Sequence, residues 1–118
     1  MENDLSNRLL KFAIDTILFL RKVKNNEESL IIKRQLIKSS TSSGANYEEA
    51  QGGSSKADFT NKVRISLKEM RESNYWFKVL KGTLQETSLK TECKNLVRES
   101  EELKKILGSI CAKTERKK

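Results

Sequence analysis

The 118-residue chain contains no proline, no histidine and only five glycines. A β-rich protein needs turn residues every ~8–12 positions, so their scarcity, together with abundant Lys, Glu and Leu, favours long helices. The absence of histidine removes the commonest general base and the commonest metal ligand. No apolar run approaches the ~20 residues of a membrane span, and the N-terminal segment MENDLSNR is unlike a signal peptide. We therefore expect a cytoplasmic protein.

Motifs that carry catalysis or hold cofactors are missing as well. Gly52-Gly53 lacks the Lys-Ser/Thr pair that completes a phosphate-binding loop. Glu48 and Glu49 are adjacent, and adjacent helical positions point in different directions, so this pair alone forms no two-carboxylate site. A di-metal carboxylate bundle needs Glu-x-x-His on two helices, and neither is present. We expect no enzymatic activity, no cofactor and no metal.

The chain has two cysteines, Cys93 and Cys111, which fall in one predicted helix. Their separation of 18 residues corresponds to roughly 27 Å along a helix, whereas a disulfide needs Cα atoms within ~7 Å. Both lie among apolar positions, so we expect buried free thiols.

Apolar residues recur at three- and four-residue steps in four segments, as in amphipathic helices. The pattern predicts helices over about residues 4–24, 27–51, 54–84 and 89–113, and the third of them begins with the cap signal Ser54-Ser55. In the first helix Ile14 and Leu18 widen the apolar stripe; in the second, Leu30, Ile31, Leu36 and Ile37 are the expected anchors. Short connections predict an all-α fold, an antiparallel up-down-up-down four-helix bundle over residues 1–113. Residues 114–118 would form a basic tail.

Residues 39–51, SSTSSGANYEEAQ, decide this architecture. Their composition favours a loop, but Ser40, Gly44 and Tyr47 continue the helical spacing of the preceding residues. Each helical serine costs roughly 0.5 kcal/mol relative to alanine, which close packing of neighbouring helices must offset. We predict a continuous helix that ends at Gly52-Gly53.

The net charge is +8, from 24 basic and 16 acidic residues. On the third helix, one face away from the core carries a basic stripe with an interleaved tyrosine: Arg64, Lys68, Arg71, Tyr75 and Lys78. Basic charge supplies affinity for a nucleic acid and an aromatic ring can stack on a base; the alternative is an ordinary solvated helix face. The C-terminal Lys113, Arg116, Lys117 and Lys118 form a second cluster, either a nucleic-acid-binding arm or a solubilising tail.

A third strip of the same helix holds Ile65, Trp76 and Val79. Apolar residues outside the core usually mark an interface, and homo-oligomers are the commonest assemblies of soluble proteins. The strip therefore predicts self-association. Alternatively, Trp76 packs under a loop or against the edge of a neighbouring helix.

Four segments together resemble a known family: residues 41–50 (TSSGANYEEA), 57–59 (ADF), 62–72 (KVRISLKEMRE) and 75–76 (YW). They are similar to the 23S rRNA intervening-sequence proteins, a bacterial four-helix-bundle family, although Ser43 and Met70 depart from its usual residues. The resemblance implies a ring, typically a homopentamer. It also implies that Ser42, Asn46, Glu49 and Glu72 occupy the family's characteristic polar positions and form hydrogen bonds between the second and third helices or across subunits. Gly44, in the same segment, is a further candidate structural residue.

Proteins similar to this family serve as accessory factors of diversity-generating retroelements, where a basic pentamer binds nucleic acid and a reverse transcriptase. The resemblance thus implies RNA or DNA as one partner and a polymerase-type protein as another. The leading hypothesis is an oligomeric, non-catalytic bundle that binds nucleic acid by charge and shape. The alternative is a protein-binding scaffold without nucleic-acid affinity. Binding to a membrane surface is disfavoured, because the apolar positions are needed for the core and no separate insertion face is expected.

Overall fold

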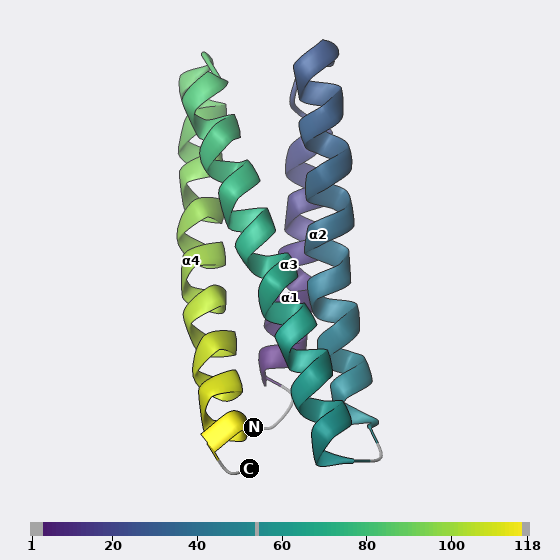
Figure 1. The fold of residues 1–118 in the computed structure, drawn as a ribbon. Coiled ribbons are helices and arrows are strands. Elements are labelled where there is room, and N and C mark those ends of the chain that lie inside the picture. The colour runs from purple at the N-terminus through teal and green to yellow at the C-terminus, as the bar shows by residue number, and fades with distance from the viewer. Residues whose placement is uncertain (1–3, 54, 117–118) are drawn as a thin grey trace.

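The computed structural model describes residues 4–53 and 55–116, and the side chains of all of these except residue 116. Four helices follow one another: α1 (Asp4–Leu20), α2 (Glu27–Gln51), α3 (Lys56–Thr83) and α4 (Thr87–Arg116). Each runs antiparallel to its predecessor (Figure 1), and α4 returns against α1. The predicted antiparallel four-helix bundle is confirmed.

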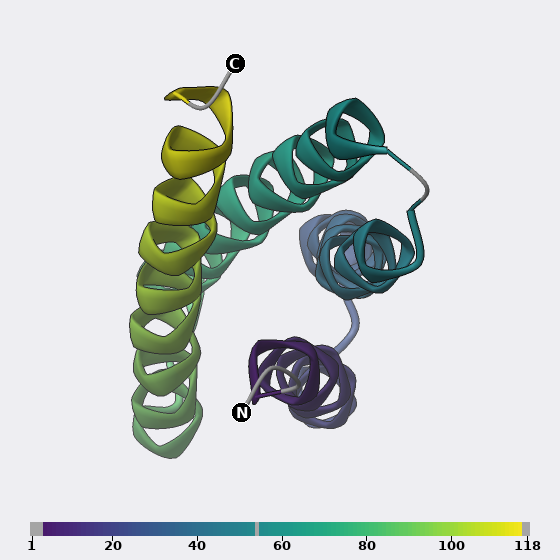
Figure 2. The same ribbon diagram turned by 90° about the horizontal axis from the view of Figure 1, so that it is seen from below.

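The two helical hairpins are not parallel to each other. Seen from below, α1 and α2 are viewed end-on whereas α3 and α4 run obliquely across the picture (Figure 2). Contact is most extensive between α2 and α3 and least extensive between α1 and α4. The α2–α3 pair therefore forms the central packing of the bundle.

Local signals fix most helix ends. The side chain of Asn26 accepts a hydrogen bond from the Ser29 N–H (2.8 Å), and Ser29 Oγ accepts one from the Asn26 N–H (2.9 Å), which is a reciprocal cap on α2. Ser55 caps α3 by accepting from the Asp58 N–H; Ser54 lies outside the described residues. Two ends differ from expectation. The helix α1 stops at Leu20, followed by tight turns, and α4 continues past residue 113 to Arg116, into the predicted tail.

Residues 39–51 are helical throughout, as predicted. Ser39, Ser40 and Ser43 are completely buried. Because their side chains are small, the neighbouring helices can pack close to α2. A methyl group on Gly44 would lie 3.5 Å from the Leu9 Cβ, the distance of ordinary contact. The helix α1 thus comes close to the backbone of α2 at Gly44, in a space that would still admit a methyl group.

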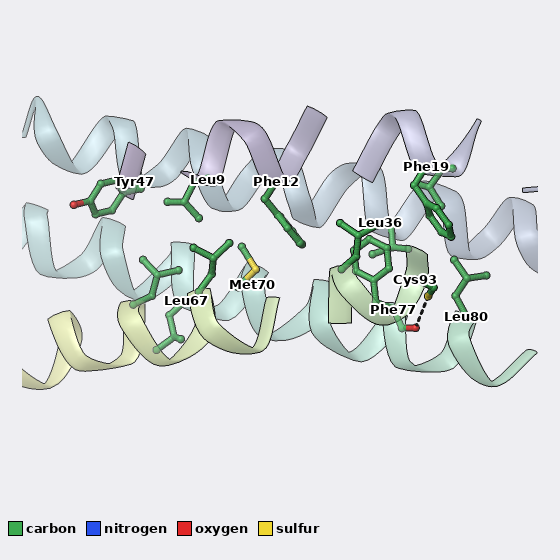
Figure 3. Close-up of a cluster of buried hydrophobic side chains, with 14 of the residues drawn as sticks. Leu9, Phe12, Phe19, Leu36, Tyr47, Leu67, Met70, Phe77, Leu80 and Cys93 are labelled. Atoms are coloured by element: carbon green, nitrogen blue, oxygen red, sulfur yellow. Dashed lines mark hydrogen bonds between the residues drawn. The ribbon is translucent and has the colours of Figure 1, made fainter. Parts of the chain in front are cut away.

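The core runs the length of the bundle (Figure 3). Phe77 of α3 is fully buried in this core and meets two rings from α1, those of Phe12 (centroids 5.9 Å apart, edge-on) and Phe19 (6.4 Å). Leu36 of α2, with Leu103 and Leu107 of α4, is fully buried in the same core. All four helices therefore contribute side chains to one core.

Several predicted core residues lie outside it. Leu30, Ile31 and Ile37 of α2 are exposed, and so are Ile14 and Leu18 of α1. The inward line of α2 instead contains Ser29, Ile32, Leu36, Ser40, Ser43 and Tyr47. A position one residue off this line is rotated by about 100° around a helix of 3.6 residues per turn, which turns those side chains outward.

Hydrogen bonds between side chains join the helices inside the core. Ser39 Oγ lies 2.7 Å from Ser73 Oγ, Ser43 Oγ donates to the Ser66 carbonyl (2.9 Å), and Ser66 Oγ donates to the Ser43 carbonyl (2.7 Å). These bonds satisfy hydroxyl groups that would otherwise be costly to bury. They connect α2 to α3 at two positions along the helices, Ser39–Ser73 and Ser43–Ser66.

Both cysteines are buried free thiols, as predicted. Cys93 Sγ donates to the Phe77 carbonyl at 3.3 Å, and burial raises the pKa of the Cys93 thiol to about 11. Burial also raises the pKa of the Cys111 thiol. Neither thiol is activated for nucleophilic chemistry, because the thiolate form is disfavoured.

Candidate nucleic-acid interface

The predicted basic stripe of α3 lies along the side that faces α4. All five of its residues are exposed. Arg64 donates two hydrogen bonds to Glu115 of α4 (2.6 and 3.1 Å), and Lys78 Nζ lies 3.7 Å from Glu101. Among the residues that the structure describes, Lys68 and Arg71 form no ion pair. The stripe is thus real as a geometric feature, but the charge of Arg64 and part of that of Lys78 are neutralised within the chain.

A second basic row lies on α4 and was missed at the sequence level. Its members are exposed, share the outer face of the helix and form no ion pair within residues 4–53 and 55–115: Lys90, Lys94, Arg98 and Lys105. Their steps of four, four and seven residues place them in one line. A helical wheel drawn for the last helix as well as the third would have found them.

The two rows together form what we call the α3–α4 basic face. It consists of Lys68, Arg71, Tyr75 and Lys78 on α3 and Lys90, Lys94, Arg98 and Lys105 on α4. Glu101 lies between the rows, where the nearby Lys104 and Lys78 lower the pKa of its carboxyl. This carboxylate is bonded to Lys104 (3.1 Å), so the face remains predominantly positive.

The acidic residues of α4 are turned mainly towards α1. Arg8 of α1 pairs with Glu99 (2.8 Å) and Glu102 (2.7 Å), and Lys22 pairs with Glu92 (2.8 Å). The hydrogen bond from Arg8 to Glu99 raises the pKa of the Arg8 guanidinium. These three carboxylates face the α1 side of α4, whereas Glu101 and Glu115 face α3. The cations that have no ion pair among the described residues project outward. This separation of charge is what makes one face of the bundle basic.

The C-terminal cluster is only partly described. Lys113 is exposed and the backbone of Arg116 is helical. The side chain of Arg116 and all of Lys117 and Lys118 lie outside the described residues.

The strip of Ile65, Trp76 and Val79 is half-buried rather than open. Trp76 and Val79 pack against the core, which matches the alternative of packing within the chain. Two buried polar atoms of the same side of α3, Trp76 Nε1 and Glu69 Oε1, have no hydrogen-bond partner among the described residues. Burial, reinforced by the neighbouring Glu72, raises the pKa of the Glu69 carboxyl.

The polar positions implied by the resemblance do not link α2 to α3 within the described chain. Asn46 donates to the Ser42 carbonyl (2.9 Å) and to its hydroxyl (3.1 Å), both on α2. Glu49 is exposed and Glu72 is half-buried. The bonds between α2 and α3 come instead from the four buried serines described above, a role that sequence spacing alone did not assign.

Exposed apolar residues gather along the α1–α2 pair. On α1, Leu10, Ile14 and Leu18 follow one another at four-residue steps. On α2, Leu30 and Ile37 precede Gly44 by fourteen and seven residues and therefore lie on the same side of the helix as Gly44, which faces α1. The exposed fractions of these five apolar side chains are between 41% and 59%. A groove of about 410 Å³ lies between the two helices, lined by Ser6, Leu9, Leu10, Ala13, Thr41, Gly44, Ala45 and Glu48. We call this the α1–α2 apolar face. These apolar positions are therefore not taken up by the core, contrary to the reasoning by which the sequence disfavours a separate apolar face.

The described part of the chain contains neither a metal-binding group of side chains nor a membrane-spanning helix. No group of three or more Cys, Asp or Glu residues there could hold a metal ion. None of the helices over residues 4–53 and 55–116 combines the length and the apolar character that crossing a membrane requires.

Comparisons with known proteins agree with the fold. The model of the family described as 23S rRNA-intervening sequence protein matches residues 1–109. The crystal structure at 1.70 Å of a protein of unknown function from the S23 ribosomal protein family of Bacteroides thetaiotaomicron superposes with a TM-score of 0.80. The two chains are 33% identical, and the match covers 91% of this chain and 97% of that one. No curated protein matches the sequence. Because the family model spans most of the chain, the protein belongs to the 23S rRNA-intervening sequence protein family, as the pattern of its second and third helices predicts.

Proposed function

We propose that this protein is a non-catalytic, homo-oligomeric bundle that binds RNA or DNA by charge and shape. The observation that carries the proposal is the α3–α4 basic face. There, exposed cations of two helices lie in adjacent rows, and most have no carboxylate partner within residues 4–53 and 55–115. Cations that are not paired within the chain can neutralise phosphates and release their counterions, which is the main source of non-specific affinity for nucleic acids. The family name refers to 23S rRNA, so RNA is the first probe to test.

Self-association is supported by the α1–α2 apolar face. Its large apolar side chains at regular spacing would be covered by a second copy of the chain. The resemblance implies a ring of five, and a ring requires two different faces of each subunit to meet. The strip of Ile65, Trp76 and Val79, which carries buried polar atoms without partners among the described residues, is the second face in this proposal. The α3–α4 basic face then stays open for nucleic acid.

The binding experiment uses fluorescence anisotropy of a labelled RNA at several salt concentrations. Affinity should fall steeply with salt, and the double variant Lys94→Glu with Arg98→Glu should weaken binding about tenfold or more. It should also reduce the slope of log K against log salt by up to about 1.4 to 1.8, because each of the two lost phosphate contacts contributes about 0.7 to 0.9.

The matched control is Arg21→Glu with Lys24→Glu. It makes the same change of charge at two exposed residues of the α1–α2 connection and should leave affinity within twofold. Equal losses in both variants would show that net charge, and not this face, governs binding. The absence of any RNA or DNA binding by the unaltered protein would refute the proposal.

The α1–α2 apolar face also supports the alternative function, a scaffold for a protein partner such as a polymerase. In that case the same face would bind the partner, and charge reversal on α4 would have no effect. Affinity of the protein for a purified partner, lost in a Leu10→Gln variant but kept in the Lys94→Glu, Arg98→Glu variant, would favour it.

A further inference from the structure

Tyr75 is the one aromatic residue left open to solvent in the described chain. Its exposed fraction is 59%, whereas Tyr47, Phe12, Phe19 and Phe77 are buried. Phe59 and Trp76 are half-buried and pack against the core. An exposed tyrosine does not add to the stability of this bundle through burial, so its position on the surface is informative.

Tyr75 lies inside the α3–α4 basic face. Arg71 precedes it by four residues and Lys78 follows it by three, so all three share one side of α3. The two cations are seven residues apart, or roughly 10 Å along the helix, and Tyr75 lies between them in the sequence. Phosphates bound by the cations would therefore bring the intervening nucleotide to the ring.

The ring is also held in place before any ligand arrives. Its centroid lies 5.3 Å from that of Trp76, edge to face at 74°, and Trp76 is itself packed on the core. An aromatic group that is already positioned loses less conformational entropy on binding. The contact leaves more than half of the Tyr75 surface free.

We infer that Tyr75 is a stacking platform for an unpaired base, and that the α3–α4 basic face consequently prefers single-stranded nucleic acid to a duplex; this rests on the proposed function. Base stacking on an aromatic side chain requires a base whose face is uncovered, which unpaired nucleotides offer and duplexes do not. A surface that binds only duplex phosphates gains nothing from an open tyrosine flanked by cations.

The test compares an unpaired 20-nucleotide poly(U) RNA with a 20-base-pair RNA duplex, each titrated into the unaltered protein and three variants. Tyr75→Ala and Tyr75→Leu should lower affinity for poly(U) by about fivefold to a hundredfold, as expected for the loss of one stacked base. Tyr75→Phe, which keeps the ring, should bind poly(U) within about twofold of the unaltered protein. In Tyr75→Ala and Tyr75→Leu, the loss of affinity for the duplex should be much smaller than the loss of affinity for poly(U). Since Tyr75 is exposed, the variants should stay folded, which circular dichroism checks.

Emission of Trp76, the only tryptophan, gives a second readout. Poly(U) should change its fluorescence through the contact with Tyr75, and the duplex should change it less. Unaltered affinity of Tyr75→Leu for poly(U), or an equal loss for poly(U) and the duplex, would overturn the inference while leaving the proposed function in place. Failure of the unaltered protein to bind either RNA would overturn the inference, and failure to bind single-stranded and duplex DNA of the same lengths as well would refute the proposed function.

Discussion

The two hairpins of this bundle share one core but present different surfaces. The α1–α2 pair exposes leucine and isoleucine side chains along a groove, and residues 4–51 carry 8 basic and 6 acidic residues. The α3–α4 pair exposes rows of lysine and arginine, and residues 55–116 carry 14 basic and 9 acidic residues. Apolar surface is suited to covering by another protein and basic surface to covering by a polyanion. One chain can therefore offer a face for assembly and a separate face for nucleic acid.

The largest expected effect comes from breaking the core that both hairpins share. Phe77→Ala removes the ring that contacts Phe12 and Phe19 across the bundle and should cost about 3–5 kcal/mol of unfolding free energy. Urea denaturation followed by circular dichroism measures this. Tyr75→Ala, two residues away but exposed, should change stability by less than about 0.5 kcal/mol. Similar losses in both variants would contradict the assignment of Phe77 to the core.

The second prediction separates the two surfaces. Replacing Leu10, Ile14 and Leu18 together with glutamine should convert the assembly to monomers, because it removes the apolar contact surface while leaving the core intact. Light scattering reports the mass, and RNA affinity per subunit should fall because fewer faces act together. The Lys94→Glu, Arg98→Glu variant should lose RNA affinity yet keep the mass of the unaltered protein. A glutamine variant of unchanged mass would place the subunit interface elsewhere.

The third prediction concerns the hydroxyl groups between the hairpins. Ser73→Ala leaves Ser39 Oγ buried without its partner at 2.7 Å, so it should cost about 1–3 kcal/mol. Adding Ser39→Ala removes the orphaned group, and the double variant should be more stable than the single one. Denaturation of the four members of this cycle measures the coupling. Strictly additive losses would mean that the two hydroxyls do not depend on each other.

Much of this architecture could be predicted from spacing alone. Helices, bundle topology and buried thiols follow from apolar residues at three- and four-residue steps, and even the serine-rich segment 39–51 obeyed that period. Spacing did not predict which apolar residues are buried where a helix has more of them than the core can hold. Leu30, Ile31 and Ile37 each fit a plausible helical line, and only the packing of α1 and α3 on α2 shows that Ile32 and Leu36 form the inner one.

The candidate site was predictable only in part, for a related reason. The α3 stripe follows from one helix and was found, but the pairing of Arg64 with Glu115 depends on how α3 and α4 are aligned. That alignment joins residues 51 positions apart in the sequence. Periodicity within a helix contains no information about it. Which cations remain free for a ligand is thus a property of tertiary structure.

The smallest expected effect is the pH dependence of stability that Glu69 causes on the side of α3 that carries the strip of Ile65, Trp76 and Val79. Burial raises the pKa of the Glu69 carboxyl above its ordinary value of 4.5, so the folded state holds a proton there more tightly than the unfolded chain does. The resulting penalty is absent at a pH below the unfolded value and develops as the pH rises through the raised folded value. Glu69→Gln removes the charge at nearly constant shape and should therefore stabilise the protein slightly at pH 7.

The free energy of unfolding is measured for the unaltered protein and for Glu69→Gln, at pH 7 and near pH 3.5. The other carboxylates titrate in both proteins, so their contribution cancels in the difference between the two. The advantage of the Glu69→Gln variant should shrink towards zero at the lower pH. If a second copy covers the strip of Ile65, Trp76 and Val79 and donates a hydrogen bond to Glu69 Oε1, which has no partner among the described residues, the substitution should instead destabilise the assembled protein at pH 7. The slight stabilisation should then persist only in the monomeric variant that carries the glutamines at Leu10, Ile14 and Leu18. The same substitution thus distinguishes a surface exposed to water from one that a neighbouring subunit completes.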